Sequence, residues 1–327
     1  MANRVTVAAT ARLHLGFLDL NGGLGRRFGS LGLALEGPET VLELSRAPTS
    51  TASGPQAERA LGLVERLAAH IGLPSRHRIV MRSAIPAHAG LGSGTQLALA
   101  CGAALRTLHG LVLDVEGDAL ALDRGARSGL GTGLFLQGGL ALDGGRGPSD
   151  HPAPIIARLP FPEDWHVLLV LDPEHQGIHG RDEIEAFKAL PVFPAETAAH
   201  LCRLTVMQAL PAVAEHDLSA FGRAITEIQT RVGDHFGAVQ GGRFASRGVT
   251  AVLNLLAANG VEGYGQSSWG PTGFAFAASR ADARRLQDIA TPIAAEKGLA
   301  LQVVKGRNSG ATINEMAEAV KKGARHG

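Results

Sequence analysis

The amino-acid sequence predicts an α+β fold of two domains, and three observations support this prediction. The chain has 327 residues, which is more than a single hydrophobic core usually serves. Strand-like runs and helical patterns are mixed without a strict strand–helix–strand period, which favours α+β over a doubly wound sheet. Residues 144–154 are dense in Gly and Pro, so we place a boundary there, between an N-terminal domain, 1–155, and a C-terminal domain, 156–327.

In the N-terminal half, short apolar runs bounded by turn residues indicate strands, and apolar positions at helical spacing indicate helices. The predicted strands are 5–10, 31–36, 40–46, 77–82 and 134–142. The predicted helices are 57–71, 97–108 and a short one at 118–126. Gly37-Pro38 is expected to join the second and third strands as a turn.

The C-terminal half follows the same logic. Its predicted strands are 165–171, 272–278 and 299–304, and its predicted helices are 182–190, 196–215, 218–232, 247–259 and 282–296. Pro211 is expected to kink or end the second of these helices, because proline removes a backbone donor inside a helix.

Composition excludes several classes of protein. The formal net charge of +1 gives no general attraction to nucleic acid or to a membrane surface. Cys101 and Cys202 are the two cysteines, so there is no disulfide framework and no CxxC metal motif. No run approaches the roughly 20 apolar residues of a membrane helix, and no signal peptide is recognisable, so we expect a cytoplasmic protein. The sequence does not give the oligomeric state, and a homodimer is one candidate.

The most informative stretch is a glycine-rich loop between a predicted strand and a predicted helix. Glycines there allow backbone N–H groups to point inward, and the following helix adds the positive end of its dipole, so the loop is a candidate phosphate cradle. Its candidate phosphate-binding residues are Gly90, Leu91, Gly92, Ser93, Gly94, Thr95 and Gln96. No Gly-Lys-Ser/Thr follows as in a Walker A loop, and Thr95 stands where a dinucleotide fingerprint has glycine. The alternative is an ordinary turn before a helix.

A second group of candidates follows the first predicted strand, where polar side chains interrupt an apolar run. Arg12, Arg26 and Arg27 are suited to binding phosphate or carboxylate groups. Asp19 is a candidate for holding a metal ion or stabilising a cation, and His14 for carrying a proton. The alternatives are a structural ion pair between Arg12 and Asp19 and a satisfied buried histidine.

A third group lies in the polar, glycine-dense stretch 263–273, which is costly in chain entropy if it only connects two elements. Its candidate substrate contacts are Gln266, Ser267 and Ser268. The alternative is a long hairpin.

A fourth group is the segment 175–183, which follows an apolar strand. Gly177 argues against a helix that would align its two histidines for zinc, so we predict a substrate loop, with His179 and with Arg181, Asp182 or Glu183 near the ligand. The alternative is a solvated surface loop. Lys305 begins a basic glycine turn that either covers phosphates or is solvated.

The order of these motifs resembles the GHMP superfamily of small-molecule kinases, in residues 10–22, in Pro86 to Ser93 and in 263–273. The kinases usually continue their loop as Gly-Leu-Gly-Ser-Ser-Ala, whereas this chain has Gly94 and Thr95 after Ser93. With Gly-Ile-His-Gly and Gly-Gln-Ser-Ser-Trp-Gly-Pro-Thr, the chain looks like the non-kinase branch, the β-ribofuranosylaminobenzene 5′-phosphate synthases. The resemblance implies a two-domain GHMP-type fold of mixed sheets with helices packed on one face of each.

The resemblance also implies a reaction in tetrahydromethanopterin biosynthesis. Phosphoribosyl pyrophosphate condenses with 4-aminobenzoate, or with 4-hydroxybenzoate, to give a C-riboside 5′-phosphate, carbon dioxide and pyrophosphate. It further implies Mg²⁺, with Ser93 and Asp19 as candidate ligands, and Asp19 and His14 as candidate catalytic residues. An ATP-dependent kinase and a catalytically silent binding protein are the competing hypotheses.

Overall fold

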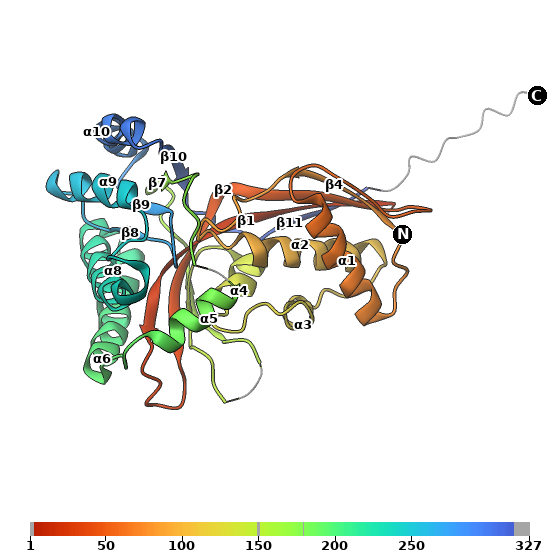
Figure 1. The fold of residues 1–327 in the computed structure, drawn as a ribbon, viewed down its shortest axis with the longest axis horizontal. Helices are drawn as coiled ribbons and strands as arrows, with labels where there is room; N and C mark the ends of the chain where they lie inside the picture. Colours follow the sequence, from red (N-terminus) through yellow and green to blue (C-terminus); the bar gives the residue numbers. More distant parts are fainter. Residues whose placement is uncertain (1–2, 149–150, 179, 317–327) are drawn as a thin grey trace, which may run out of the picture.

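The computed structural model describes residues 3–148, 151–178 and 180–316. Two long antiparallel strands, β1 (Arg4–Asp19) and β2 (Phe28–Arg46), run from one half of the molecule into the other (Figure 1). Within the described residues no helix is long and apolar enough to cross a membrane.

The first sheet has seven strands in the order β11-β1-β2-β4-β3, with β5 pairing with β2 and β6 pairing with β5. Its remaining strands are β3 (Thr51–Ser53), β4 (His77–Ser83), β5 (Leu140–Asp143), β6 (Ile155–Leu159) and β11 (Thr312–Met316). Its helices are α1 (Ala57–Ile71), α2 (Ser93–Leu108), α3 (Val115–Ala121) and α4 (Leu130–Gln137). The sheet therefore draws β6 and β11 from beyond residue 155, and the domain boundary near that residue stays a prediction.

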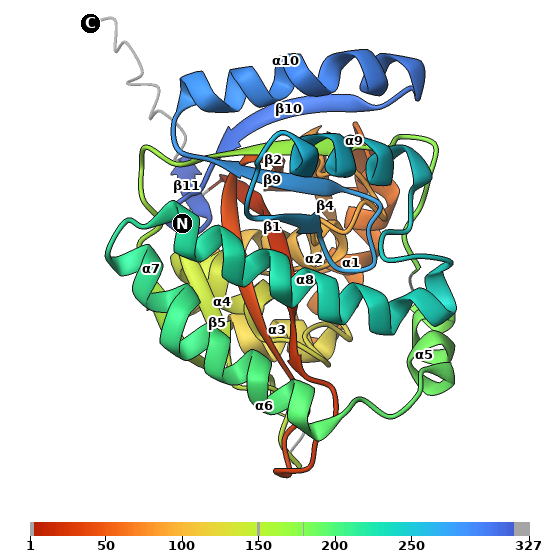
Figure 2. The same ribbon diagram turned by 90° about the vertical axis from the view of Figure 1, so that its left-hand side faces the viewer.

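The second sheet has four strands in the order β10-β7-β9-β8. They are β7 (His166–Leu171), β8 (Tyr264–Gln266), β9 (Gly273–Ala277) and β10 (Ala300–Lys305). Helices α9 (Arg247–Ala258) and α10 (Arg280–Glu296) cover one face of this sheet, and α8 (Leu218–Gln240) lies on the other (Figure 2). These mixed sheets and helices confirm the predicted α+β class.

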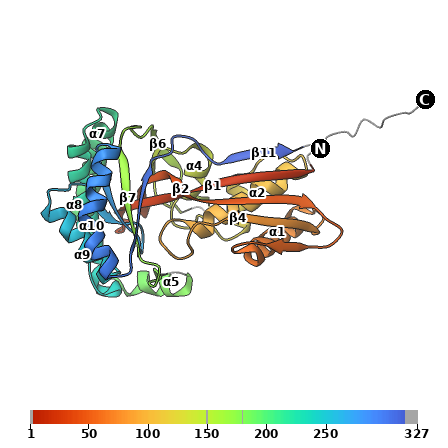
Figure 3. The same ribbon diagram turned by 90° about the horizontal axis from the view of Figure 1, so that it is seen from above.

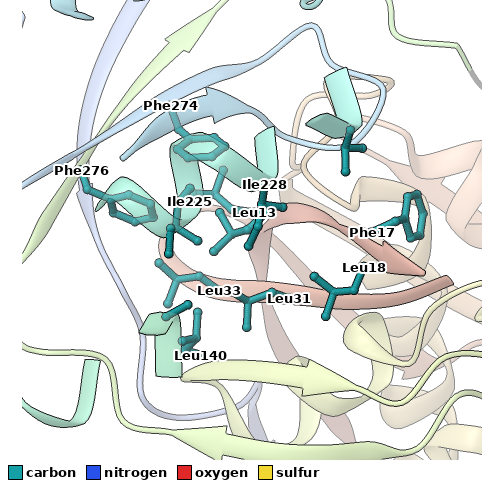
Figure 4. Packing of buried hydrophobic residues seen from close by; sticks show 14 of the residues in the cluster. Leu13, Phe17, Leu18, Leu31, Leu33, Leu140, Ile225, Ile228, Phe274 and Phe276 are labelled. Atoms are coloured by element: carbon teal, nitrogen blue, oxygen red, sulfur yellow. The ribbon is translucent and has the colours of Figure 1, made fainter. Parts of the chain in front are cut away.

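Helix α8 joins the two halves, because it packs on the second sheet and also on the β1–β2 pair (Figure 4). Ile225 and Ile228 lie between Leu13 on β1 and Phe274 on β9, and all four side chains are buried. This shared core fixes the first strand against the C-terminal elements. The remaining helices are α5 (Gly180–Ala189), α6 (Ala195–Leu204) and α7 (Leu210–Ala214), and seen from above α5 lies beside both halves (Figure 3).

Three element predictions need correction. The first strand does not end at residue 10, because α6 and α8 bury the second face of β1 and allow it to continue to Asp19. The predicted strands 31–36 and 40–46 are one strand, β2, with Gly37-Pro38 inside it rather than at a turn. The predicted strand 134–142 is the end of α4 followed by β5, separated at Gly138, whose φ is +64°. An apolar run of this length fits either a buried helix or a buried strand.

Pro211 does not end the helical segment, which continues to Ala214; the regular α-helix is interrupted before this residue. A π-helical turn at Thr205–Ala209 separates α6 from α7, and Pro211 lies in the first turn of α7. There the missing N–H of proline needs no helical acceptor.

Candidate active site

The glycine-rich loop lies between β4 and α2 and is held against the 263–273 stretch. Gly90 has a φ of +77°, and a Cβ at this position would lie 2.3 Å from the carbonyl oxygen of Ser267 and 2.9 Å from that of Gly270. Only glycine fits such a close approach of two backbones. The loop and the stretch 263–273, distant in sequence, therefore form one structural unit.

Part of the loop faces a cavity of about 350 Å³, called here the larger cavity. Five residues of the loop line it: Gly90, Gly92, Ser93, Gly94 and Thr95. Gly92 precedes the first residue of α2, and no side chain caps this helix end. The N–H groups of Thr95 and Gln96 donate to the carbonyl oxygen of Gly92 at 3.1 Å and 3.0 Å, so the backbone donors left for a ligand are those that precede them, beside the cavity. This arrangement has the features of an anion cradle.

Two predicted loop residues lie elsewhere. Leu91 is fully buried in the hydrophobic core. Gln96 is buried, and its side-chain amide donates to the carbonyl oxygen of Gly131 at 3.0 Å. Both side chains therefore pack in the interior beneath the loop and do not line the cavity.

Ser267 connects three segments instead of contacting the cavity. Its Oγ accepts a hydrogen bond from the backbone N–H of His14 at 3.0 Å and donates to the carbonyl oxygen of Gly90 at 2.8 Å. The side chain of Gln266 is also internal, because it accepts from the N–H of Ala245 at 2.6 Å. Ser268, by contrast, lines the larger cavity. Of the three predicted substrate contacts, Ser268 therefore lines the larger cavity, whereas Gln266 and Ser267 hold the surrounding segments together.

Arg12 lies on β1 directly below the loop. Its Nη1 approaches the carbonyl oxygen of Gly90 at 3.4 Å, and its backbone N–H donates to that of Leu91 at 3.1 Å. Burial lowers the pKa of Arg12 to about 10, although the carboxylates of Glu183 and Asp143 oppose this shift. Arg12 therefore remains charged at neutral pH and directs a positive charge at the loop.

Three further arginines line the larger cavity: Arg59 on α1, and Arg124 and Arg127 in the segment between α3 and α4. With Arg12 they form what we call the four-arginine cluster. Sequence reasoning missed all three of these residues. The available signal was Gly129-Leu-Gly-Thr-Gly133, which echoes the glycine loop and directly follows Arg124 and Arg127.

Glu183 on α5 is the acidic side chain nearest this cluster. Its carboxylate pairs with Arg127 at 2.5 Å and lines the larger cavity. Burial raises the pKa of Glu183, and the charge of Arg127 opposes the shift. The prediction that Arg181, Asp182 or Glu183 lies near the ligand site fits this position. Arg181 lies near the start of α5, and His179 lies outside the described residues.

A smaller cavity of about 160 Å³ adjoins the larger one. The two share Arg12, Thr95, Arg124, Arg127, Glu183 and Ser268, so they are continuous. His14 and Phe17 line only the smaller one, with their rings 4.4 Å apart in an edge-to-face arrangement. Burial, followed by the charge of Arg12, holds the pKa of His14 well below its ordinary value, so its imidazole is neutral at neutral pH. Its Nε2 has no hydrogen-bond partner in the part of the chain that the structure describes.

Asp19, Arg26 and Arg27 are not brought to the glycine loop. They line a separate cavity of about 260 Å³ at the β1–β2 hairpin. Asp19 Oδ1 accepts from the N–H groups of Asn21 at 2.9 Å and Gly22 at 2.8 Å, as in a turn. The reason is geometric: seven residues of extended strand between Arg12 and Asp19 span roughly 23 Å.

Three of the four basic side chains predicted to bind phosphate are placed elsewhere. Arg26 donates to the carbonyl oxygens of Gly144 and Gly145, and Arg27 donates to that of Leu20. Lys305 ends β10, opposite His166 on β7. Their role in phosphate binding therefore has no support in the geometry of the larger cavity.

The predicted Mg²⁺ ligands do not form one site. Ser93 lines the larger cavity and Asp19 the hairpin cavity. Within the described ranges, no three residues of the His, Cys, Asp and Glu types are grouped so that they would hold a metal ion. Mg²⁺ stays a prediction, and its ordinary ligands would include the phosphates of a substrate.

The fold and this glycine-loop site define a protein of the GHMP superfamily. The family model described as GHMP kinases N terminal domain matches residues 58–134, and the model described as GHMP kinases C terminal matches residues 209–292. Two solved structures are similar in fold. Mevalonate diphosphate decarboxylase from Enterococcus faecalis has a TM-score of 0.68 and 15% identity, with 97% of this chain and 100% of that chain covered. Homoserine kinase from Cytophaga hutchinsonii has a TM-score of 0.65 and 17% identity, with 96% and 98% covered.

Within the superfamily, the chain belongs to the family of beta-ribofuranosylphenol 5′-phosphate synthases. It is 36% identical to the protein of that name from Archaeoglobus fulgidus, over 93% of this chain and 97% of the relative. It is 32% identical to the Methanothermobacter thermautotrophicus protein of the same name, over 83% of this chain and 88% of the relative. The resemblance to the non-kinase branch is therefore confirmed.

Proposed function

We propose that the protein transfers the phosphoribosyl group of phosphoribosyl pyrophosphate to the ring of 4-aminobenzoate or 4-hydroxybenzoate, with release of carbon dioxide and pyrophosphate. The observation that carries the proposal is the four-arginine cluster around the glycine loop, which suits a donor with several negative charges. The same proposal gives the chain a step in tetrahydromethanopterin biosynthesis and a requirement for Mg²⁺.

The names of the relatives bear on the acceptor. They contain a ribofuranosylphenol, and a phenol is what remains of 4-hydroxybenzoate when its carboxylate is lost as carbon dioxide. The same loss from 4-aminobenzoate leaves an aniline. Both acceptors have a strongly electron-donating group opposite the carboxylate, so both fit the chemistry below.

The reaction balances without net proton transfer. The bond between the anomeric carbon and the diphosphate breaks, and its electron pair leaves with pyrophosphate. The ring carbon that bears the carboxylate supplies a π pair for the new carbon–carbon bond, so the ring becomes cationic. The bond to the carboxylate then breaks, its electron pair restores the aromatic ring, and carbon dioxide leaves.

The residues of the two cavities match the charges that develop. Arg12, Arg127 and the amides of the glycine loop would stabilise the departing pyrophosphate. The carboxylate of Glu183 would oppose the positive charge on the ribose, as carboxylates do in glycoside cleavage. This gives Glu183 the cation-stabilising role that the sequence assigned to Asp19.

The smaller cavity is the proposed place for the acceptor. It joins the larger cavity at Arg127 and Glu183, and its other wall carries His14 and Phe17. A neutral imidazole would not repel a ring that becomes cationic. No proton carrier is needed in the balance above, so His14 would act as part of the wall.

The test is to incubate the protein with phosphoribosyl pyrophosphate, Mg²⁺ and either acceptor labelled in its carboxylate. We expect labelled carbon dioxide and pyrophosphate in equal amounts with at least one acceptor. ADP formed from ATP and a small-molecule acceptor would instead support a kinase. Tight binding of phosphoribosyl pyrophosphate without turnover would support a binding protein, and either result contradicts the proposal.

A further inference from the structure

Two arginines meet over the first turn of α2. A Cβ placed on Gly94 would lie 2.9 Å from Arg59 Nη2 and 3.6 Å from Arg124 Nη1. Arg59 comes from α1 and Arg124 from the segment after α3, so the packing of separate elements brings the two charges together. Both side chains line the larger cavity.

Within the described residues, neither of these guanidinium groups forms an ion pair with a carboxylate, although the charge of Asp123 acts on Arg124 and opposes the lowering of its pKa by burial. Arg59 Nη1 donates to the side-chain oxygen of Gln56 at 3.2 Å, and within the described residues Arg124 Nε has no hydrogen-bond partner. Asp123, the neighbour of Arg124 in sequence, pairs instead with Arg66 at 2.6 Å. Burial lowers the pKa of Arg124, and the charge of Arg59 lowers it further. Two like charges held together in a cavity favour a doubly charged anion between them.

This pair is distinct from the contacts of Arg12. Arg12 lies under Gly90 and Gly92, at the start of the loop, whereas Arg59 and Arg124 lie over Gly94, at the start of the helix. Two groups of positive charge therefore follow one another along the same backbone. The donor of the proposed reaction likewise has two anionic groups, a diphosphate on its anomeric carbon and a monophosphate on its C5.

We propose that Arg59 and Arg124 form a phosphomonoester subsite that holds the C5 phosphate of the donor, while Arg12 with Gly90 and Gly92 holds the diphosphate. This assignment rests on the proposed function. The acceptor has to reach the carbon that bears the diphosphate. The proposed acceptor cavity is lined by Arg12 and by Arg124, which both cavities share, but not by Arg59. The end of the donor near Arg59 is therefore the end remote from the reacting carbon.

The subsite also explains Gly94. The GHMP kinases usually have serine where this chain has Gly94, and a side chain there would occupy the space in which the end of Arg59 lies. Glycine at this position keeps the cation pair next to the helix.

The test is to measure the binding of ribose 5-phosphate and of pyrophosphate separately, by calorimetry, to the full chain. Arg59→Gln and Arg124→Gln are expected to weaken ribose 5-phosphate by about 10- to 100-fold, the range for lost hydrogen bonds to charged groups, and pyrophosphate by less than about twofold. Arg82→Gln is the matched control, because Arg82, on β4, is more than half exposed, pairs with Glu43 at 2.9 Å and lines neither cavity. It is expected to change neither affinity.

The assignment is overturned if the Arg59 and Arg124 variants lose pyrophosphate as strongly as ribose 5-phosphate, if they lose neither, or if the wild type binds neither compound. Failure of the proposed reaction has a different signature. In that case the wild type releases no labelled carbon dioxide, while the selective loss of ribose 5-phosphate in the variants still demonstrates the subsite.

Discussion

Replacing Gly90 by alanine tests whether the glycine loop and the 263–273 stretch act as one unit. The new Cβ would meet two backbone carbonyl oxygens, at 2.3 Å and 2.9 Å, and neither belongs to a flexible side chain. Alanine in the left-handed region costs about 1–2 kcal/mol, and forcing an atom into a packed site adds about 1–3 kcal/mol. We therefore expect Gly90→Ala to lower the free energy of unfolding by about 2–5 kcal/mol.

A matched control separates the two contributions. Gly110 has a similar φ of +68°, but a Cβ there meets nothing within 4 Å. Gly110→Ala should therefore lose only the conformational part, about 1–2 kcal/mol. Urea unfolding followed by circular dichroism gives both free energies of unfolding. Calorimetry gives the affinity of each variant for pyrophosphate, which shows whether the loop keeps its conformation. The reasoning is refuted if Gly90→Ala is no less stable than Gly110→Ala and binds pyrophosphate as the wild type does.

Three further predictions concern Glu183 and Gly94. Glu183→Gln should lower kcat by about 100-fold. The reason is that a unit charge about 5 Å from a cation contributes about 3 kcal/mol at an effective dielectric constant near 20. An unchanged kcat would show that Glu183 does not stabilise the transition state. Because burial raises the pKa of Glu183 and the ionised form is the active one, wild-type kcat should fall as pH is lowered through that raised pKa, and the pH profile of Glu183→Gln should lack this acidic limb. Gly94→Ala should raise the free energy of unfolding by up to about 1 kcal/mol, because alanine favours a helix. The same variant should bind ribose 5-phosphate more weakly, because the new Cβ displaces the end of Arg59. An unchanged affinity in calorimetry would contradict the close approach of Arg59 to residue 94.

The sequence predicted the position of the loop well because local chemistry determines it. A strand, three alternating glycines and an apolar helix are contiguous, and the structure places them as β4, the loop and α2. The approach of Arg59 to Arg124 was beyond such reasoning. Arg59 and Arg124 approach each other only because α1 and the segment after α3 pack around α2. No short pattern in the sequence encodes that approach.

The placement of Asp19 shows a different failure. Charged residues after an apolar run suggested the end of a strand, and a site at that end. In the structure Arg12 and His14 are inside β1, since this strand is covered on both faces, and Asp19 lies at its distant end. The predicted group was therefore divided: Arg12 and His14 line the joined cavities, whereas Asp19, Arg26 and Arg27 line the hairpin cavity.

Net charge is a poor guide to this site because the fold distributes charge unevenly. The whole chain has 31 Lys and Arg residues against 30 Asp and Glu, which gave no reason to expect a strongly anionic ligand. Around the larger cavity, however, the four-arginine cluster faces one carboxylate among the described lining residues, that of Glu183, which is already paired with Arg127. Such an excess of buried positive charge is stabilised when a multiply charged anion enters. The local excess, rather than the overall balance, is what suits this cavity to the phosphorylated donor that we propose.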